Sequence, residues 1–304
     1  MDVYLLFKSV YFVYNTPDNS EKTIFGKEAY MKRILTIQDI SCVGKCSLTV
    51  ALPVISAMGI ETAIIPTAVL STHTMFNNFT CVDLEDQIVP ITDHWLSEGI
   101  DFECIYTGYL AGAGQIDIIK DVFRKFDTLT IVDPVMADNG KLYPAFDEAF
   151  AAKMATLCAQ ADIILPNITE ASLMTGMEYK TVYDEAYIKE MLKRLCGIGA
   201  GISVVTGVGF AAGKTGAYGY DSKNDEFYYY ENDLIDAVYH GTGDIFASTF
   251  TGALMNDLSW KEALPIAADY TARCISNTLA DPNGREYGVN FEAELPYLLE
   301  RLGK

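Results

Sequence analysis

The sequence has few basic residues and almost no histidine. Its 22 lysines and arginines and three histidines stand against 41 aspartates and glutamates, which gives a formal net charge of −19 over 304 residues. A chain this acidic repels phosphate backbones and anionic lipid surfaces, so neither nucleic acid nor a membrane is expected as a partner. A polyphosphate ligand would need local help from helix N-termini, a metal ion or individual lysines.

Long apolar runs and paired cysteines are missing as well. No stretch approaches the roughly 20 apolar residues that span a bilayer, and the apolar start contains Asp2 and Lys8 and lacks the cleavage site of a secretory signal. The seven cysteines are scattered, and Cys42 and Cys46 have no second pair that would complete a zinc site. We therefore interpret the cysteines as reduced packing residues and expect a cytoplasmic protein.

Several common enzyme motifs are absent from the chain. It contains no GxxxxGK[ST] phosphate loop and no GxGxxG after the first predicted strand, and it also lacks HExxH and GxSxG. Metalloprotease and serine-hydrolase functions are thereby disfavoured. A nucleotide site has to be built from another part of the chain.

From Met31 onward, predicted strands alternate with predicted helices. Strands are expected at 33–38, 64–70, 104–107, 128–132, 162–165 and 202–206, with a hairpin at 215–220 and 226–230. Helices are expected near 52–58, 84–96, 115–126, 146–158, 183–196, 242–255, 263–274 and 292–300. This alternation predicts an α/β fold with a mainly parallel central sheet and helices on both faces. We expect residues 31–304 to form a single domain and residues 1–30 to be a peripheral N-terminal extension.

Polar side chains follow the predicted strands where the strands end. Ligands of parallel α/β sheets bind beyond the carboxyl ends of the strands. The polar residues at these ends are Asp39, His73, Thr74, Tyr109, Asp133, Asn167 and Thr206. Their coincidence predicts a ligand site along one edge of the sheet.

The stretch His240-Gly241-Thr242-Gly243-Asp244 is the strongest candidate for the reacting centre. It precedes a predicted helix, so Asp244 should lie in the first turn, where unpaired backbone amides can hold phosphate oxygens. A carboxylate at this place could accept a proton from an attacking hydroxyl. The alternative is a simple glycine turn in which Thr242 or Asp244 caps the helix.

The other candidates also have structural alternatives. Asp133 could bind a magnesium-bound water, but an aspartate after a strand is typical of a turn. Asn167 and Glu170 could face a metal and phosphates, but their spacing is also that of a capping box. Thr206 could contact a phosphate or simply begin a loop. His73 lies among small polar residues, which favours a binding role over a core role.

Seven motifs occur in a particular order along the chain. They are ILTIQD, VLSTHT, YTGYL, VDPVMAD, LPNITEASLMTG, VVTG and HGTGDIFAS. With this series, the chain resembles the pyridoxal kinases of the ribokinase-like superfamily from about Met31 to the last helices. The resemblance implies a ribokinase-like fold without a large lid, usually assembled as a homodimer. It also implies transfer of the ATP γ-phosphate to the 5'-hydroxymethyl group of pyridoxal, pyridoxine or pyridoxamine, with Mg²⁺ and often K⁺.

The resemblance further implies roles for the candidate residues. By motif match, Asp244 is the base, and the backbone amides of the first turn form an anion hole, namely those of Gly241, Thr242, Gly243 and Asp244. The metal and the phosphates would be bound by Asp133, Asn167 and Glu170, and the nucleotide by Thr206. The residues that would surround the pyridine ring are Asp39, His73, Thr74 and Tyr109. Two positions depart from the family. Asp39 stands where many members have serine, and Val132 stands where some relatives have a reactive cysteine.

Three other functions remain open from the sequence. Hydroxymethylpyrimidine kinases act on a similar ring, but they typically end the glycine motif in cysteine where this chain has Asp244. Sugar and nucleoside kinases of the same superfamily usually carry an added lid with its own strands, and none is predicted between residues 39 and 110. A non-catalytic pyridoxal-phosphate-binding protein would not need the base Asp244.

Overall fold

The computed structural model describes residues 31–304, so the expected N-terminal extension, residues 1–30, lies outside the described residues. The main sheet consists of β1 (Arg33–Ser41), β2 (Glu61–Leu70), β3 (Cys81–Asp83), β4 (Cys104–Thr107), β5 (Leu129–Val132), β8 (Ile163–Ile164), β9 (Ile202–Thr206), β10 (Lys214–Asp221) and β11 (Glu226–Asp233). A separate two-stranded sheet consists of β6 (Ala137–Asp138) and β7 (Lys141–Leu142).

The helices alternate with these strands. They are α1 (Leu48–Ala57), α2 (Glu85–Ser97), α3 (Ala113–Phe126), α4 (Glu148–Cys158), α5 (Ile168–Thr175), α6 (Glu185–Ile198), α7 (Thr242–Met255), α8 (Trp260–Ala280) and α9 (Leu295–Arg301), with the short 3₁₀ helix η1 (Phe291–Glu294) directly before α9. None of the helices between residues 31 and 304 is both long enough and apolar enough to cross a bilayer.

The main sheet is parallel in its centre and antiparallel at both edges. Its strand order is β11-β10-β9-β8-β5-β4-β1-β2-β3. The strands from β9 to β2 in this order pair in parallel. The hairpin β10–β11 extends one edge and β3 the other, both by antiparallel pairing. This topology confirms the predicted α/β fold with a mainly parallel sheet.

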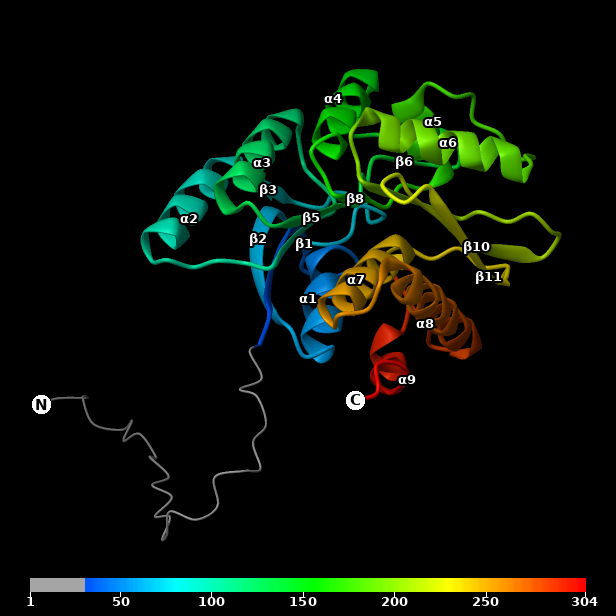
Figure 1. The fold of residues 1–304 in the computed structure, drawn as a ribbon. Coiled ribbons are helices and arrows are strands. Elements are labelled where there is room, and N and C mark those ends of the chain that lie inside the picture. Colours follow the sequence, from blue (N-terminus) through cyan, green and yellow to red (C-terminus); the bar gives the residue numbers. More distant parts are fainter. Residues whose placement is uncertain (1–30) are drawn as a thin grey trace, which may run out of the picture. The chain divides into compact units, whose positions relative to one another are not determined.

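Helices cover both faces of the sheet. Helices α1, α7, α8 and α9 lie on one face, and α2 to α6 lie on the other (Figure 1). Successive strand residues point to opposite faces, and each face buries its own hydrophobic core. Ile34 and Ile131 pack in the core under α1, α7 and α8, whereas their neighbours Leu35 and Val132 pack in the core under the other helices.

Two predicted boundaries near the start of the domain are wrong. Strand β1 does not end before Asp39 but continues to Ser41, and its pairing with β2 shifts register between Gln38 and Ile40. Such a bulge bends the strand and redirects the side chains around it. Helix α1 begins at Leu48 rather than near residue 52, and Pro53 lies inside it.

The region between residues 39 and 110 holds one short additional strand. The three residues of β3 pair with the end of β2 and are exposed. This strand was not predicted, but it extends the main sheet and does not form a separate lid.

Candidate active site

The glycine stretch forms the N-terminal turn of α7. Gly241 is the N-cap with φ of 78°, a left-handed conformation, and Asp244 lies in the first turn. No side chain caps this helix, so the alternative in which Thr242 or Asp244 serves only as a helix cap is wrong. The first backbone amides of α7 have no partner within the helix. They are available to an anion from outside.

Space around the two glycines differs in a way that suits a ligand. A Cβ atom at Gly241 would lie 1.9 Å from the carbonyl oxygen of Lys45, so only glycine fits between α7 and the loop before α1. A Cβ at Gly243 would have nothing within 4 Å. The turn is therefore closed on the side of the loop and open over Gly243, where a phosphate could approach the backbone.

The Asp244 carboxylate lies between this turn and the loop 42–47, which joins β1 to α1. The backbone N–H of Ser47 donates a hydrogen bond to it. Burial raises the pKa of Asp244 to about 7, the Ser47 hydrogen bond lowers it, and the negative charge of Asp39 raises it further. A carboxylate with a pKa near neutrality is well matched to accept a proton from an alcohol at physiological pH.

Ser47 has an unusual backbone conformation, which fixes the direction of its N–H group. It precedes α1 with φ of 48° and ψ of −130°, a conformation that is rare for residues other than glycine. Strain of this kind is found where function requires a fixed geometry. No sequence pattern indicated this conformation, because a serine at this position is compatible with many backbone angles.

Two more carboxylates lie close enough to each other to interact, and one of them, Asp133, also interacts with Asp244. Asp133 directly follows β5 and is buried, and its pKa is raised well above the usual range by burial and by the charges of Glu170 and Asp244. Burial also raises the pKa of Glu170 to about 8, although three backbone N–H groups donate hydrogen bonds to it and lower it. The predicted grouping of Asp133, Glu170 and Asp244 is present.

Asn167 and Glu170 form the capping box that their spacing predicted. The Asn167 side chain accepts from the Glu170 N–H at 3.0 Å, and the Glu170 carboxylate accepts from the Asn167 N–H at 2.9 Å. The Glu170 carboxylate also accepts from the N–H of Met136 at 3.0 Å. The capping role and a position beside Asp133 thus coexist in one residue, and both interpretations of Glu170 remain compatible with the geometry.

Thr206 lies beside Asn167 at the adjacent strand ends. The two residues form a parallel β-bridge, and the Thr206 N–H donates to the carbonyl of Pro166 at 2.9 Å. The following residue, Gly207, has φ of 74°, which turns the chain away from the sheet. The half-buried Thr206 side chain stands at the same edge of the sheet as Asn167.

Asp39 is buried at the bulge in β1. Ser41 and Ser47 donate side-chain hydrogen bonds to it, but burial raises its pKa. Tyr109, at the end of β4, has a pKa raised to about 12 by burial and by the charges of Asp39 and Cys81. The Tyr109 ring also lies 5.4 Å from the ring of Phe146. Asp39 and Tyr109 are thus brought together, as predicted for residues at strand ends.

His73 packs against a residue to which the sequence assigned no role. Its ring centroid is 4.4 Å from that of His240, the residue before Gly241. Burial, together with His240, lowers the pKa of His73 to about 4, and burial lowers the pKa of His240. Both rings are neutral at pH 7 and can form hydrogen bonds without charge. Thr74, next to His73, is exposed.

The carboxylates do not form a ready-made metal site. Among residues 31–304, no three His, Cys, Asp or Glu side chains are placed so that they could hold a metal ion together. Carboxylate oxygens are nevertheless the ligands that Mg²⁺ prefers, and Mg²⁺ usually combines one or two of them with phosphate oxygens and water. The charges of Glu170 and Asp244 raise the pKa of Asp133, and a bound cation would relieve this repulsion.

Comparison with known proteins agrees with this geometry. The model of the phosphomethylpyrimidine kinase family matches residues 50–288. The chain belongs to this family. It is therefore a ribokinase-like kinase, and the family predicted from the seven motifs is confirmed.

The relatives of this kinase include both pyridoxine kinases and hydroxymethylpyrimidine/phosphomethylpyrimidine kinases. Pyridoxine kinase of Bacillus subtilis is 32% identical over 199 residues, which cover 63% of this chain and 69% of that protein. Hydroxymethylpyrimidine/phosphomethylpyrimidine kinase of the same organism is 28% identical over 207 residues, covering 64% and 74%. A Bacteroides thetaiotaomicron protein, described as a phosphomethylpyrimidine kinase and crystallised with pyridoxal, is 35% identical, with a TM-score of 0.84 over 88% of this chain and 96% of that protein.

Proposed function

We propose that this kinase transfers the γ-phosphate of ATP to the 5'-hydroxymethyl group of pyridoxal, pyridoxine and pyridoxamine. The observation that carries the proposal is the Asp244 carboxylate, with its pKa near 7, in the first turn of α7 beside the open backbone of Gly243. Support comes from the resemblance to pyridoxine kinase and to the protein crystallised with pyridoxal.

In this proposal the reaction is an in-line transfer at the mouth of α7. The 5'-hydroxyl oxygen forms a bond to the γ-phosphorus while the bond from that phosphorus to the β–γ bridging oxygen breaks, and ADP leaves. Asp244 accepts the hydroxyl proton. The amides of Thr242 and Gly243 donate hydrogen bonds to the γ-phosphate oxygens, and the positive end of the α7 dipole favours their charge.

The proposal assigns the other strand ends to ATP and Mg²⁺. Asp133 and Glu170 would hold the ion, which neutralises charge on the phosphates when bound. Asn167 and Thr206 lie beside them on the nucleotide side. The amide nitrogen of the Asn167 side chain already donates a hydrogen bond to the Ala137 carbonyl, and its oxygen accepts one from the Glu170 N–H. Asn167 would therefore act mainly by holding Glu170 in place.

The pyridine ring would lie near the bulge of β1. Asp39, buried at that bulge, can bond to the ring hydroxyl or to a protonated ring nitrogen. His73 accepts the Met75 N–H at Nδ1, so its neutral ring carries the proton at Nε2 and can donate from there. Tyr109 and Thr74 complete this side of the site.

One assay separates the proposal from its rivals. ADP release is measured in parallel with pyridoxal, pyridoxine, pyridoxamine, hydroxymethylpyrimidine and ribose at equal concentrations. We expect the highest kcat/KM with one of the three vitamers. A higher value with hydroxymethylpyrimidine or ribose would contradict the vitamer assignment. Tight pyridoxal phosphate binding without any ADP release would instead identify a non-catalytic binding protein.

Hydroxymethylpyrimidine kinase activity is the second candidate. It is favoured by the family model and by the 28% identity to the Bacillus subtilis enzyme. The glycine motif ends in Asp244 rather than in the cysteine typical of such enzymes, and this difference leads us to rank it second.

Three further parts of the proposal concern ions, assembly and compartment. We propose that K⁺ supports activity, which a comparison of rates in K⁺ and Na⁺ tests. We propose a homodimer, since residues 75–82 expose the large apolar side chains of Met75, Phe76, Phe79 and Val82 at the β3 edge, and light scattering after gel filtration tests this. We propose a cytoplasmic location because all seven cysteines are free.

A further inference from the structure

Lys45 lies in the loop 42–47, and its backbone is enclosed by two glycines from distant parts of the chain. Its carbonyl oxygen is packed against Gly241, where a Cβ would lie 1.9 Å away. Its own Cβ is packed against Gly288, where an added Cβ would lie 2.4 Å away. The Lys45 N–H also donates to the carbonyl of Tyr287 at 3.4 Å. The loop therefore contacts the first turn of α7 and the segment after α8 at a single residue.

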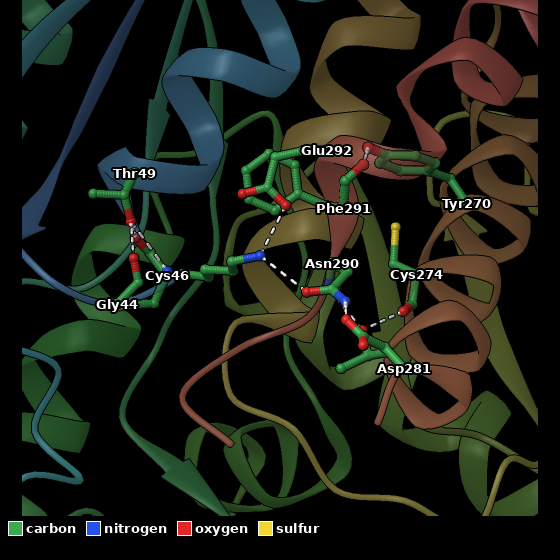
Figure 2. A network of polar contacts seen from close by, with 11 residues as sticks. Gly44, Cys46, Thr49, Tyr270, Cys274, Asp281, Asn290, Phe291 and Glu292 are labelled. Carbon is green, nitrogen blue, oxygen red and sulfur yellow. Dashed lines mark hydrogen bonds and ion pairs between the residues drawn. The ribbon is translucent and has the colours of Figure 1, made fainter. Parts of the chain in front are cut away.

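The Lys45 side chain crosses to that C-terminal segment. Its ammonium group donates to Asn290 Oδ1 at 3.2 Å and to Glu292 Oε2 at 2.8 Å (Figure 2). It also lies 5.7 Å from the centre of the Phe291 ring. The side chain is 19% exposed, so its stem is largely covered by protein.

Asn290 and Phe291, two of the residues around the Lys45 side chain, are themselves hydrogen-bonded to α8 and to its C-cap residue. The Asn290 side chain donates to Asp281 at 2.8 Å, and its backbone N–H donates to the hydroxyl of Thr278 at 2.7 Å. The Tyr270 hydroxyl donates to the carbonyl of Phe291 at 2.8 Å (Figure 2). Of the two groups that bind the Lys45 ammonium, Asn290 is held to the end of α8, whereas the Glu292 carboxylate is 55% exposed.

The same loop touches the proposed base two residues later. Ser47, in its strained conformation, donates its N–H to Asp244. The loop is also held near its start, where the Val43 carbonyl accepts from the His73 N–H at 2.8 Å. A displacement of Lys45 would therefore shift both the wall against Gly241 and the hydrogen bond to Asp244.

We propose that Lys45 is a positioning residue for phosphoryl transfer, which holds the loop 42–47 against the first turn of α7 through Asn290 and Glu292. This inference rests on the proposed function, because its consequence for rate requires Asp244 to be the base. The Lys45 ammonium is bound by Asn290 and Glu292. Lys45 acts through Ser47 and Gly241.

The test compares Lys45→Met with Lys45→Arg and a matched control. Methionine keeps most of the apolar stem but cannot bond to Asn290 or Glu292, whereas arginine can bond to both. Lys261→Met removes a comparable ion pair, with Glu226 at 2.6 Å, far from α7's first turn. We expect Lys45→Met to lower kcat by about tenfold or more, because misplacing reacting groups slightly costs much of their advantage.

The expected pattern separates positioning from general damage. The KM values for ATP and the alcohol should change by less than about threefold, because binding groups stay in place. The melting temperature should fall only slightly, since Glu292 is 55% exposed and such ion pairs add little stability. Lys45→Arg should recover most of the rate, and Lys261→Met should match the wild type.

A second readout does not depend on turnover. Hydrogen–deuterium exchange of residues 42–47 and 241–248 should be faster in Lys45→Met than in the wild type and unchanged in Lys261→Met. Equal exchange, or a kcat within twofold of the wild type, would overturn the role of Lys45. If the wild type releases no ADP with any of the five alcohols, the proposed function fails, and exchange alone decides whether Lys45 holds the loop.

Discussion

Replacing Asp244 by asparagine tests the proposed chemistry most directly. The amide keeps the size and shape of the side chain and can still accept the Ser47 N–H, but it cannot take a proton from the 5'-hydroxyl. General bases contribute roughly 10²- to 10⁴-fold to rate. We therefore expect kcat to fall by about a hundredfold or more, or about 2.7 kcal/mol in the activation barrier. The KM values should change far less.

The pH dependence of the wild type follows from the same carboxylate. With a pKa raised to about 7 by burial, about one tenth of the molecules carry the ionised base at pH 6 and about nine tenths at pH 8. The rate constant kcat should therefore rise with pH through a midpoint near 7 and then level off. In Asp244→Asn the residual rate should lose this rise.

Stability provides a control for folding. The raised pKa means that folded Asp244 holds its proton more tightly than the unfolded chain does between pH of about 4 and 7, so its ionisation opposes folding above that window. Asp244→Asn should melt no lower than the wild type at pH 8. Asp257→Asn, at a carboxylate whose side chain is 85% exposed, should keep normal kinetics. Near-normal kcat in a folded Asp244→Asn protein would refute the assignment of the base.

Three further predictions concern other parts of the protein. Gly241→Ala should lose about 2–4 kcal/mol of unfolding free energy in urea titrations, because its φ of 78° and the Lys45 carbonyl leave no room for a Cβ, whereas Gly243→Ala should lose little. Asp133→Asn should raise the melting temperature without ligands at pH 8, since it removes a buried carboxyl group whose ionisation the fold disfavours, yet lower kcat at least tenfold; a lower melting temperature would contradict this. A chain beginning at Met31 should keep both kcat and melting temperature, and loss of activity in a folded protein would show that residues 1–30 take part.

Much of the site could be predicted from the sequence because the position of each residue depends on the helix or strand next to it in the chain. Asp133 had to come directly after a buried strand, and Asp244 had to lie in the first turn of a helix, wherever those elements were placed. The carboxyl ends of parallel strands share one edge, so their neighbourhood could be inferred as well. The capping box of Asn167 and Glu170 is also a local pattern, although its sequence could not show that the same carboxylate faces Asp133.

What the sequence missed depends on contacts between distant segments. The bulge at Asp39 arises from pairing between β1 and β2, and no pattern within residues 33–41 predicts it. The start of α1 was misplaced because Pro53 suggested a helix beginning, whereas the helix begins at Leu48 and contains Pro53. The ring contact between His240 and His73 exists only in the folded chain, because the two residues are far apart in the sequence.

The sequence by itself determined the alternation of strands and helices, the polar edge of the sheet and the glycine turn before Asp244, because each depends on residues that are neighbours along the chain. Tertiary structure decided how strongly Asp244 holds its proton, why Gly241 tolerates no side chain, and that Lys45 joins the loop before α1 to the segment after α8. These properties depend on burial, charge and close approach between residues up to some 250 positions apart in the chain. No pattern of neighbouring residues predicts which of these distant residues come into contact.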